Sequence, residues 1–203
     1  DRLVFGADDG EHGVEPWSTD GTEEGTRLLA NIRVDEGTGD SSICLLAPVA
    51  GGVLFLLHEG EKGQTIWVSD GTAEGTRLLK EVGSGWSPAC DIWSSRPVGT
   101  LGEVALFAFS EEGVTGHEPW VSDGTPEGTH VLKDIAPGPD YSEPRDFTPF
   151  AGRMLFTAYE IEHGREIWWT DGTAEGTALV KDAWEGIDSP DPQYLTPFGD
   201  RVL

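Results

Sequence analysis

The sequence predicts an all-β fold, a β-propeller built from four repeats of about 50 residues that each hold four short strands. Three observations favour this fold. One ten-residue motif occurs four times along the chain. Each repeat contains four short apolar runs separated by turn-forming residues, a spacing typical of antiparallel strands. No segment shows a sustained apolar period of about 3.6 residues, so long helices are not expected.

The four strands of a repeat are expected in a constant order. The first strand carries a Pro-containing run at 46–49, 96–98, 147–150 and 195–198. The second strand ends in Phe, at 3–5, 53–55, 105–107 and 154–156. The third strand ends in Trp, at 15–17, 65–67, 118–120 and 166–168. The fourth strand follows the motif, at 27–29, 77–79, 130–132 and 178–180. Turns rich in Gly, Ser and Pro separate these runs.

The chain is expected to form a single propeller domain or segment. Its repeats span approximately 1–45, 46–95, 96–146 and 147–194, and residues 195–203 supply a closing strand or a strand of the next blade. The first repeat lacks its own first strand, which the run 195–198 would provide in a closed ring. We therefore expect closure within this chain, with an arc of a larger propeller as the alternative. The total blade number and the oligomeric state do not follow from the sequence.

The repeated motif is W-x-[ST]-D-G-T-x-E-G-T. It contains Trp17, Trp67, Trp120 and Trp168, and, three residues later, Asp20, Asp70, Asp123 and Asp171. The structural interpretation is that each Trp packs between adjacent blades, each Asp accepts hydrogen bonds from nearby backbone N–H groups, and each Gly adopts a positive φ. The alternative is a Ca²⁺ loop built on Asp20, Glu24 and their equivalents. Two carboxylates fall short of the roughly 6–8 oxygen ligands that Ca²⁺ takes.

The extended repeat resembles the bacterial ELWxxDGT repeat proteins. The most similar copy is Glu166-Ile167-Trp168 with Asp171-Gly172-Thr173, continued by 178–182. The second repeat departs, with Thr65 in place of the Glu. The resemblance covers essentially the whole chain. It implies a propeller-like architecture and a secreted or cell-surface location, and it implies no defined activity and no catalytic residue.

The composition limits the partners. Lys and Arg total 13 against 37 Asp and Glu, which gives a formal net charge of −24. Phosphate binding needs a basic surface, so a nucleic-acid partner is not expected. No stretch approaches about 18 apolar residues, so membrane insertion is not expected either. Cations, neutral sugars and basic proteins remain as partners.

Two kinds of loop vary between the repeats, and we expect them to form one face of the propeller. We call this face the loop face; it carries the loops between the second and third strands and those between the fourth strand and the next repeat. Binding residues concentrate on variable loops over a rigid scaffold. Ligand-binding candidates on it are Trp86, Trp93, Tyr141, Trp184, His12, His117 and His163. Candidates for binding Ca²⁺, the one cofactor that the sequence suggests, are Asp35, Asp40, Asp140 and Asp188.

These residues favour a non-catalytic extracellular binding or adhesion module. Its ligand would be a glycan or a protein, bound with or without Ca²⁺. One alternative is an enzyme acting on polysaccharide or a small molecule at the central channel. A second is a structural or assembly module, whose loop face is simply a solvated acidic surface. No zinc-binding spacing, nucleophile elbow or P-loop occurs in the sequence.

The two cysteines hold corresponding places in adjacent repeats. Cys44 and Cys90 each lie three residues after a Ser, just ahead of a first strand. First strands are innermost in a propeller, so a disulfide between Cys44 and Cys90 is expected to be within reach. Two buried free thiols are the alternative, and the sequence leaves both open.

Overall fold

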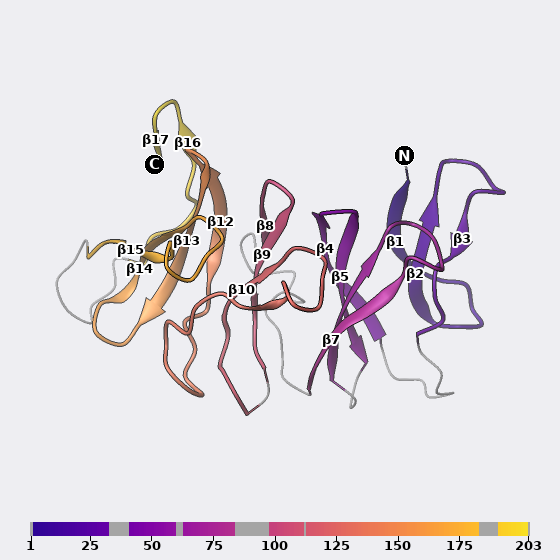
Figure 1. Cartoon of the computed structure of the whole chain (residues 1–203), viewed down its shortest axis with the longest axis horizontal. Coiled ribbons are helices and arrows are strands. Elements are labelled where there is room, and N and C mark those ends of the chain that lie inside the picture. The colour runs from indigo at the N-terminus through magenta and orange to yellow at the C-terminus, as the bar shows by residue number, and fades with distance from the viewer. Residues whose placement is uncertain are drawn as a thin grey trace.

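The computed structural model describes residues 2–32, 41–59, 63–83, 98–111, 113–182 and 191–202; the side chains of 41, 42, 44–46, 58 and 59 are outside this description. The described residues form antiparallel sheets connected by turns and loops, with no helix among them (Figure 1). Those ranges therefore contain no helix capable of crossing a membrane. The predicted all-β class is confirmed.

The sheets follow one another along the chain, and each is a simple meander. The first sheet contains β1 (Leu3–Asp8), β2 (Val14–Thr19) and β3 (Arg27–Leu28). The second contains β4 (Ser41–Val49), β5 (Gly52–Glu59), β6 (Gln64–Ser69) and β7 (Arg77–Gly83). The third contains β8 (Val98–Leu101), β9 (Val104–Phe109), β10 (Glu118–Ser122) and β11 (His130–Val131). The fourth contains β12 (Arg145–Phe150), β13 (Arg153–Glu160), β14 (Gly164–Thr170) and β15 (Ala178–Lys181). The last is a hairpin of β16 (Pro197–Phe198) and β17 (Arg201–Val202).

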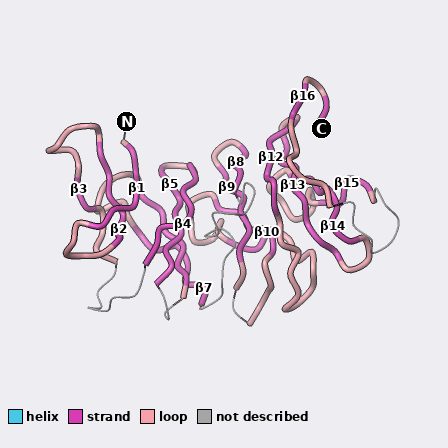
Figure 2. The backbone as a smooth tube through the Cα atoms, turned by 180° about the vertical axis from the view of Figure 1, so that it is seen from behind, coloured by secondary structure: helices cyan, strands magenta, loops and turns pink. Residues whose placement is uncertain are grey.

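The sheets stand side by side in chain order, with the two termini at opposite ends of the row (Figures 1 and 2). The first strands of successive sheets, β4, β8 and β12, contact one another, as the inner strands of propeller blades do. The expected closure within the chain is not found. Strand β16 pairs with β17 across a turn at Gly199, and β1 pairs only with β2 among the described strands.

Apolar side chains from neighbouring sheets form the core. One buried cluster joins the second and third sheets through Leu54, Leu56, Phe107 and Trp120. A second cluster joins the third and fourth sheets and includes Phe147, Phe156 and Trp168. Because the third sheet packs between the second and the fourth, its central strands β9 and β10 are buried on both sides. This packing places the motif Trp side chains of the third and fourth sheets between sheets.

The motif turns share one hydrogen-bond pattern. In each turn the Asp Oδ1 accepts from the backbone N and the hydroxyl of the Thr two residues later, at 2.6–3.0 Å. The Thr hydroxyl is the main cause that lowers the pKa of Asp20, Asp70, Asp123 and Asp171 below the usual value. The Gly after each Asp has a φ between 87° and 94°, which favours glycine. The motif carboxylates are therefore engaged within their own turns.

The same turns also connect neighbouring sheets. Ser18 Oγ of the first sheet donates to the carbonyl oxygen of Gly71 in the second motif turn at 3.0 Å. Arg77 of the second sheet donates from Nη2 to the carbonyl oxygen of Gly124 in the third motif turn at 2.9 Å. One turn thus closes a hairpin and receives a hydrogen bond from the preceding sheet.

Substitution of Gly128 by alanine is expected to destabilise the fold by about 1–3 kcal/mol. A Cβ at this position would overlap the Asp123 carboxylate, because the chain folds closely around that side chain. The carboxylate would move and lose its two hydrogen bonds from Thr125. Urea denaturation measures the loss. The Asp123→Ala, Gly128→Ala double variant should be no less stable than Asp123→Ala alone, and fully additive losses would contradict this steric explanation.

Candidate functional site

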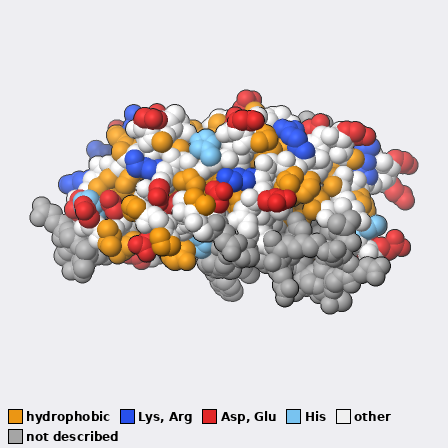
Figure 3. Space-filling model, turned by 60° about the horizontal axis from the view of Figure 1, so that its bottom comes forward, with side chains coloured by type: hydrophobic (Ala, Val, Ile, Leu, Met, Phe, Trp, Pro, Cys, Tyr) orange, Lys and Arg blue, Asp and Glu red, His pale blue; other side chains and the backbone are white. Residues whose placement is uncertain are grey.

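A pocket of about 740 Å³ opens on the loop face of the third sheet. The loop between β9 and β10 and the loop between β11 and β12 form its walls. Its lining residues are Ser110, Gly113, Val114, Thr115, Gly116, His117, Gly138, Pro139, Tyr141 and Glu143. In Figure 3 the molecule is turned so that its bottom in Figure 1 comes forward, and acidic side chains are scattered there among hydrophobic ones.

Two of the predicted ligand-binding residues meet in this pocket. The rings of His117 and Tyr141 are 5.1 Å apart between centroids, at an angle of 57°. The His117 side chain is buried, whereas Tyr141 is 56% exposed. Gly116 N donates to the Gly138 carbonyl at 3.1 Å, and a Cβ on Gly116 would overlap the carbonyl oxygen of Asp140. The loops approach this closely because position 116 has no side chain.

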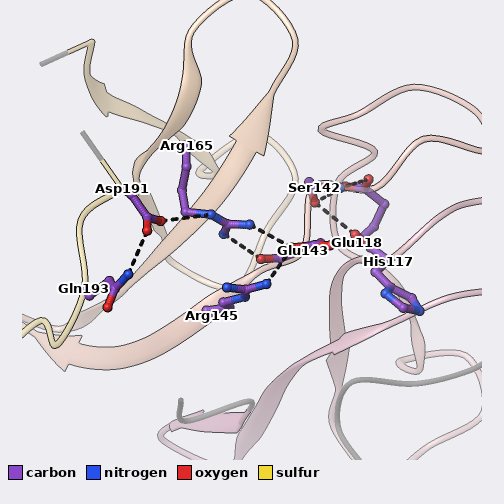
Figure 4. A network of polar contacts seen from close by, with 8 residues as sticks. All are labelled: His117, Glu118, Ser142, Glu143, Arg145, Arg165, Asp191 and Gln193. Atoms are coloured by element: carbon purple, nitrogen blue, oxygen red, sulfur yellow. Dashed lines mark hydrogen bonds and ion pairs between the residues drawn. The ribbon is translucent and has the colours of Figure 1, made fainter. Parts of the chain in front are cut away.

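A buried carboxylate, Glu118 of β10, holds in place the pocket wall formed by the loop between β11 and β12 (Figure 4). It accepts hydrogen bonds from three backbone N–H groups, those of Ile135 at 2.8 Å, Ala136 at 3.3 Å and Ser142 at 3.1 Å. The Ser142 hydroxyl donates to it at 2.7 Å. Burial raises the pKa of Glu118 to about 7, against the opposing effect of these hydrogen bonds. Glu118 thereby fixes the loop that carries Tyr141.

A buried Glu occupies this place in the first and fourth repeats as well, and in the first repeat it also accepts a hydrogen bond from the following loop. Glu15 is buried and its Oε2 accepts from Ile32 N at 3.1 Å, in the loop after β3. Glu166 is buried at the same place in β14. The signal was present, because a Glu stands two residues before the motif Trp in three repeats, with Thr65 in the second.

A charged cluster adjoins the pocket, where the fourth sheet meets the loop 139–144 (Figure 4). Glu143 Oε2 is 2.6 Å from Arg145 Nη2 and 3.1 Å from Arg165 Nη2. Arg165 also donates from Nη1 to the Glu143 carbonyl at 2.8 Å, and its Nε is 3.6 Å from Asp191 Oδ1. Gln193 donates to the other oxygen of Asp191 at 2.7 Å. Burial lowers the pKa of Arg165. Sequence reasoning missed this cluster, because its members are far apart in the chain.

The other predicted histidines lie outside the pocket. His12 Nδ1 is 2.7 Å from Asp9 in the first sheet's loop, and His163 Nδ1 is 2.8 Å from Glu160 in the fourth sheet's loop. Both hydrogen bonds raise the pKa of the ring. The same contact with His12, together with backbone donors, lowers the pKa of Asp9 to about 2. The two histidines occupy similar places in separate sheets and do not converge.

Several predicted site residues lie outside the described residues: Trp86, Trp93, Trp184, Asp35, Asp40, Asp188 and Cys90. Cys44 lies in β4, but its side chain is also outside the description, so the disulfide stays a prediction. Asp140 lies between two pocket residues, Pro139 and Tyr141. Among the residues that the structure describes, no group of three or more His, Cys, Asp or Glu is placed to hold a metal ion. The Ca²⁺ prediction therefore has no support from Asp140.

Comparison with solved structures shows the fold of this chain. It is similar to a puromycin hydrolase mutant complexed with PGG, with 16% identity over 93% of this chain and a TM-score of 0.57. It is also similar to a puromycin hydrolase, with 17% identity over 94% of this chain and a TM-score of 0.56. The chain spans 28% of the length of each. At these identities the likeness shows a β-propeller-like fold alone. No family model and no curated protein matches the chain.

Proposed function

We propose that this chain is an arc of a larger β-propeller and acts as a non-catalytic, extracellular glycan-binding module. The pocket of the third sheet would be its binding site. The open row of sheets with successive inner strands supports an arc. The resemblance of the motif to ELWxxDGT repeat proteins supports a secreted or cell-surface location.

The observation that carries this function is the exposed Tyr141 ring in a pocket of about 740 Å³. This volume is within the roughly 300–1,000 Å³ of small-molecule sites. An aromatic face packs against the apolar face of a sugar ring while hydroxyls at the ring's edge bond to polar groups. His117, Ser110 and Glu143 supply polar groups in the same lining.

The charge of the protein narrows the class of glycan. A net charge of −24 repels anionic ligands, so uronic-acid and sulfated chains are disfavoured. We therefore propose a neutral oligosaccharide as the ligand.

Substitution of Tyr141 by alanine is expected to weaken oligosaccharide binding by about tenfold or more, because the stacking surface is lost. Isothermal titration calorimetry with cellotriose, xylotriose and laminaritriose measures this, with millimolar CaCl₂ and with EDTA in parallel. The fold should be unaffected, since the Tyr141 side chain is largely exposed.

The matched control is Tyr194→Ala, because Tyr194 is also exposed but does not line the pocket. It should bind as the unchanged chain does. Equal losses in both variants would rule out this pocket. If the unchanged chain binds none of the sugars in either buffer, the proposed function fails.

A further inference from the structure

Glu143 has an unusual backbone conformation for a residue with a side chain. Its φ of 44° is in the left-handed region, which a non-glycine residue rarely adopts. Its N–H donates to the His117 carbonyl at 3.0 Å, and its own carbonyl accepts from Arg165. A backbone outlier in a pocket wall is a reason to look for a functional side chain.

Two arginines restrain the Glu143 carboxylate through one of its oxygens. Arg145 and Arg165 both contact Oε2. Among the described residues, Oε1 accepts no hydrogen bond, and Glu143 lines the pocket. Arg165 is the more constrained of the pair, because its side chain is only 10% exposed and it also binds the backbone carbonyl. Arg165 comes from β14 of the fourth sheet, so the neighbouring sheet supports this pocket.

These three charged residues are not part of the repeat. Positions that correspond to Arg165, just before the Glu or Thr of the third strand, hold Val14, Gln64 and His117. Positions that correspond to Glu143, counted from the Ser of each loop, hold Ser42, Pro88 and Pro190. Positions that correspond to Arg145 hold Cys44, Cys90 and Pro192. Residues outside the repeat pattern therefore meet in space around Glu143, which lines the pocket.

Building on the glycan-binding function proposed above, we propose that Arg165 is a positioning residue, which orients Glu143 so that its Oε1 accepts a hydrogen bond from a ligand hydroxyl. A carboxylate offers only acceptors, so at Oε1 a ligand hydroxyl is favoured over a carboxylate or sulfate group. A side chain that is already held loses little freedom when the ligand binds. The choice of ligand in the pocket of the third sheet then depends on Arg165, a residue of the fourth sheet.

The test is a double-mutant cycle on the chain, titrated with the same three trisaccharides. Arg165→Met is expected to weaken binding by about tenfold, and Arg165→Lys should recover part of the loss. If Arg165 acts through Glu143, the Arg165→Met, Glu143→Gln double variant should bind no more weakly than Glu143→Gln. Arg153→Met is the control, because Arg153 packs on Trp169 outside the pocket. Additive losses in the cycle would overturn the proposal.

Hydrogen–deuterium exchange gives a second readout that needs no ligand. The four amides of residues 140–143 should exchange faster in Arg165→Met and at an unchanged rate in Arg153→Met. Unchanged exchange in Arg165→Met would refute the positioning role, even if sugars bind. If exchange rises but the unchanged chain binds no trisaccharide, the glycan-binding function is refuted while the positioning of Glu143 stands.

Discussion

Replacement of Trp120 by alanine is expected to lower the free energy of unfolding by about 3–5 kcal/mol, the usual cost of removing a large aromatic side chain from a core. Trp120 is fully buried. Its ring centroid is 6.4 Å from that of Phe107 and 5.7 Å from that of Phe109, and Lys80 Nζ lies 4.8 Å over the ring. Lys80 belongs to the second sheet, so the cavity would open between sheets. Urea denaturation followed by circular dichroism measures the loss.

Two other tryptophan variants serve as controls for the loss of stability in Trp120→Ala. Trp169→Ala should cost about 1 kcal/mol or less, because that side chain is 37% exposed and its ring contact is with Arg153. Trp120→Phe should cost about 1–2 kcal/mol, because the indole N–H has no hydrogen-bond partner among the described residues and only volume is lost. If Trp120→Ala costs no more than Trp169→Ala, Trp120 does not hold the two sheets together.

Replacement of Glu118 by alanine is expected to cost about 3–5 kcal/mol at about pH 5, because the N–H groups of Ile135 and Ala136 lose their buried acceptor and Ser142 keeps only the His117 carbonyl. The loop that ends at Ser142 would loosen, and with it the pocket wall that carries Tyr141. Denaturation in urea over a range of pH measures the stability. Glu74→Ala, at an exposed position in the second motif turn, is the control and should change neither stability nor its pH dependence.

The Glu118→Ala effect should also depend on pH, with a sign set by the raised pKa. Burial raises the pKa of Glu118 from 4.5 to about 7, so the folded chain retains a proton that the unfolded chain releases. This stabilisation is full below about pH 4.5 and is lost as the pH rises through about 7. At about 1.4 kcal/mol per pK unit, the Glu118→Ala loss should shrink by about 3 kcal/mol between pH 5 and pH 8.

Other groups titrate both in the unchanged chain and in Glu118→Ala, so their contributions cancel in the difference between the two free energies of unfolding. The raised pKa values of His12 and His163 give stability that is lost as the pH rises, and both residues are far from Glu118 in the chain. The motif aspartates lose their contribution only as the pH falls below about 3.8, outside this window. A Glu118→Ala loss that stays constant from pH 5 to pH 8 would show that Glu118 is ionised throughout.

The strands and turns of this protein could be predicted from the sequence because their causes are local. Each motif turn is closed by an Asp and a Thr two residues apart and needs a Gly between them. Each apolar run is short and alternates with turn residues, which favours a meander of antiparallel strands. Repetition of one pattern four times makes such an assignment secure, and the all-β class follows.

Closure and the charged cluster depended on tertiary structure. Whether the run 195–198 pairs with the first sheet depends on the angle between neighbouring sheets. Many side-chain contacts between residues distant in the chain together set that angle. The pairing of Glu143 with Arg165 joins the loop before β12 to β14 across 22 positions and follows no repeat spacing. His117 and Tyr141 were both candidates, but only the close approach of their loops at Gly116 brings their rings together. Local hydrogen bonds thus determined the repeat, and packing between sheets decided which of its irregular residues share a site.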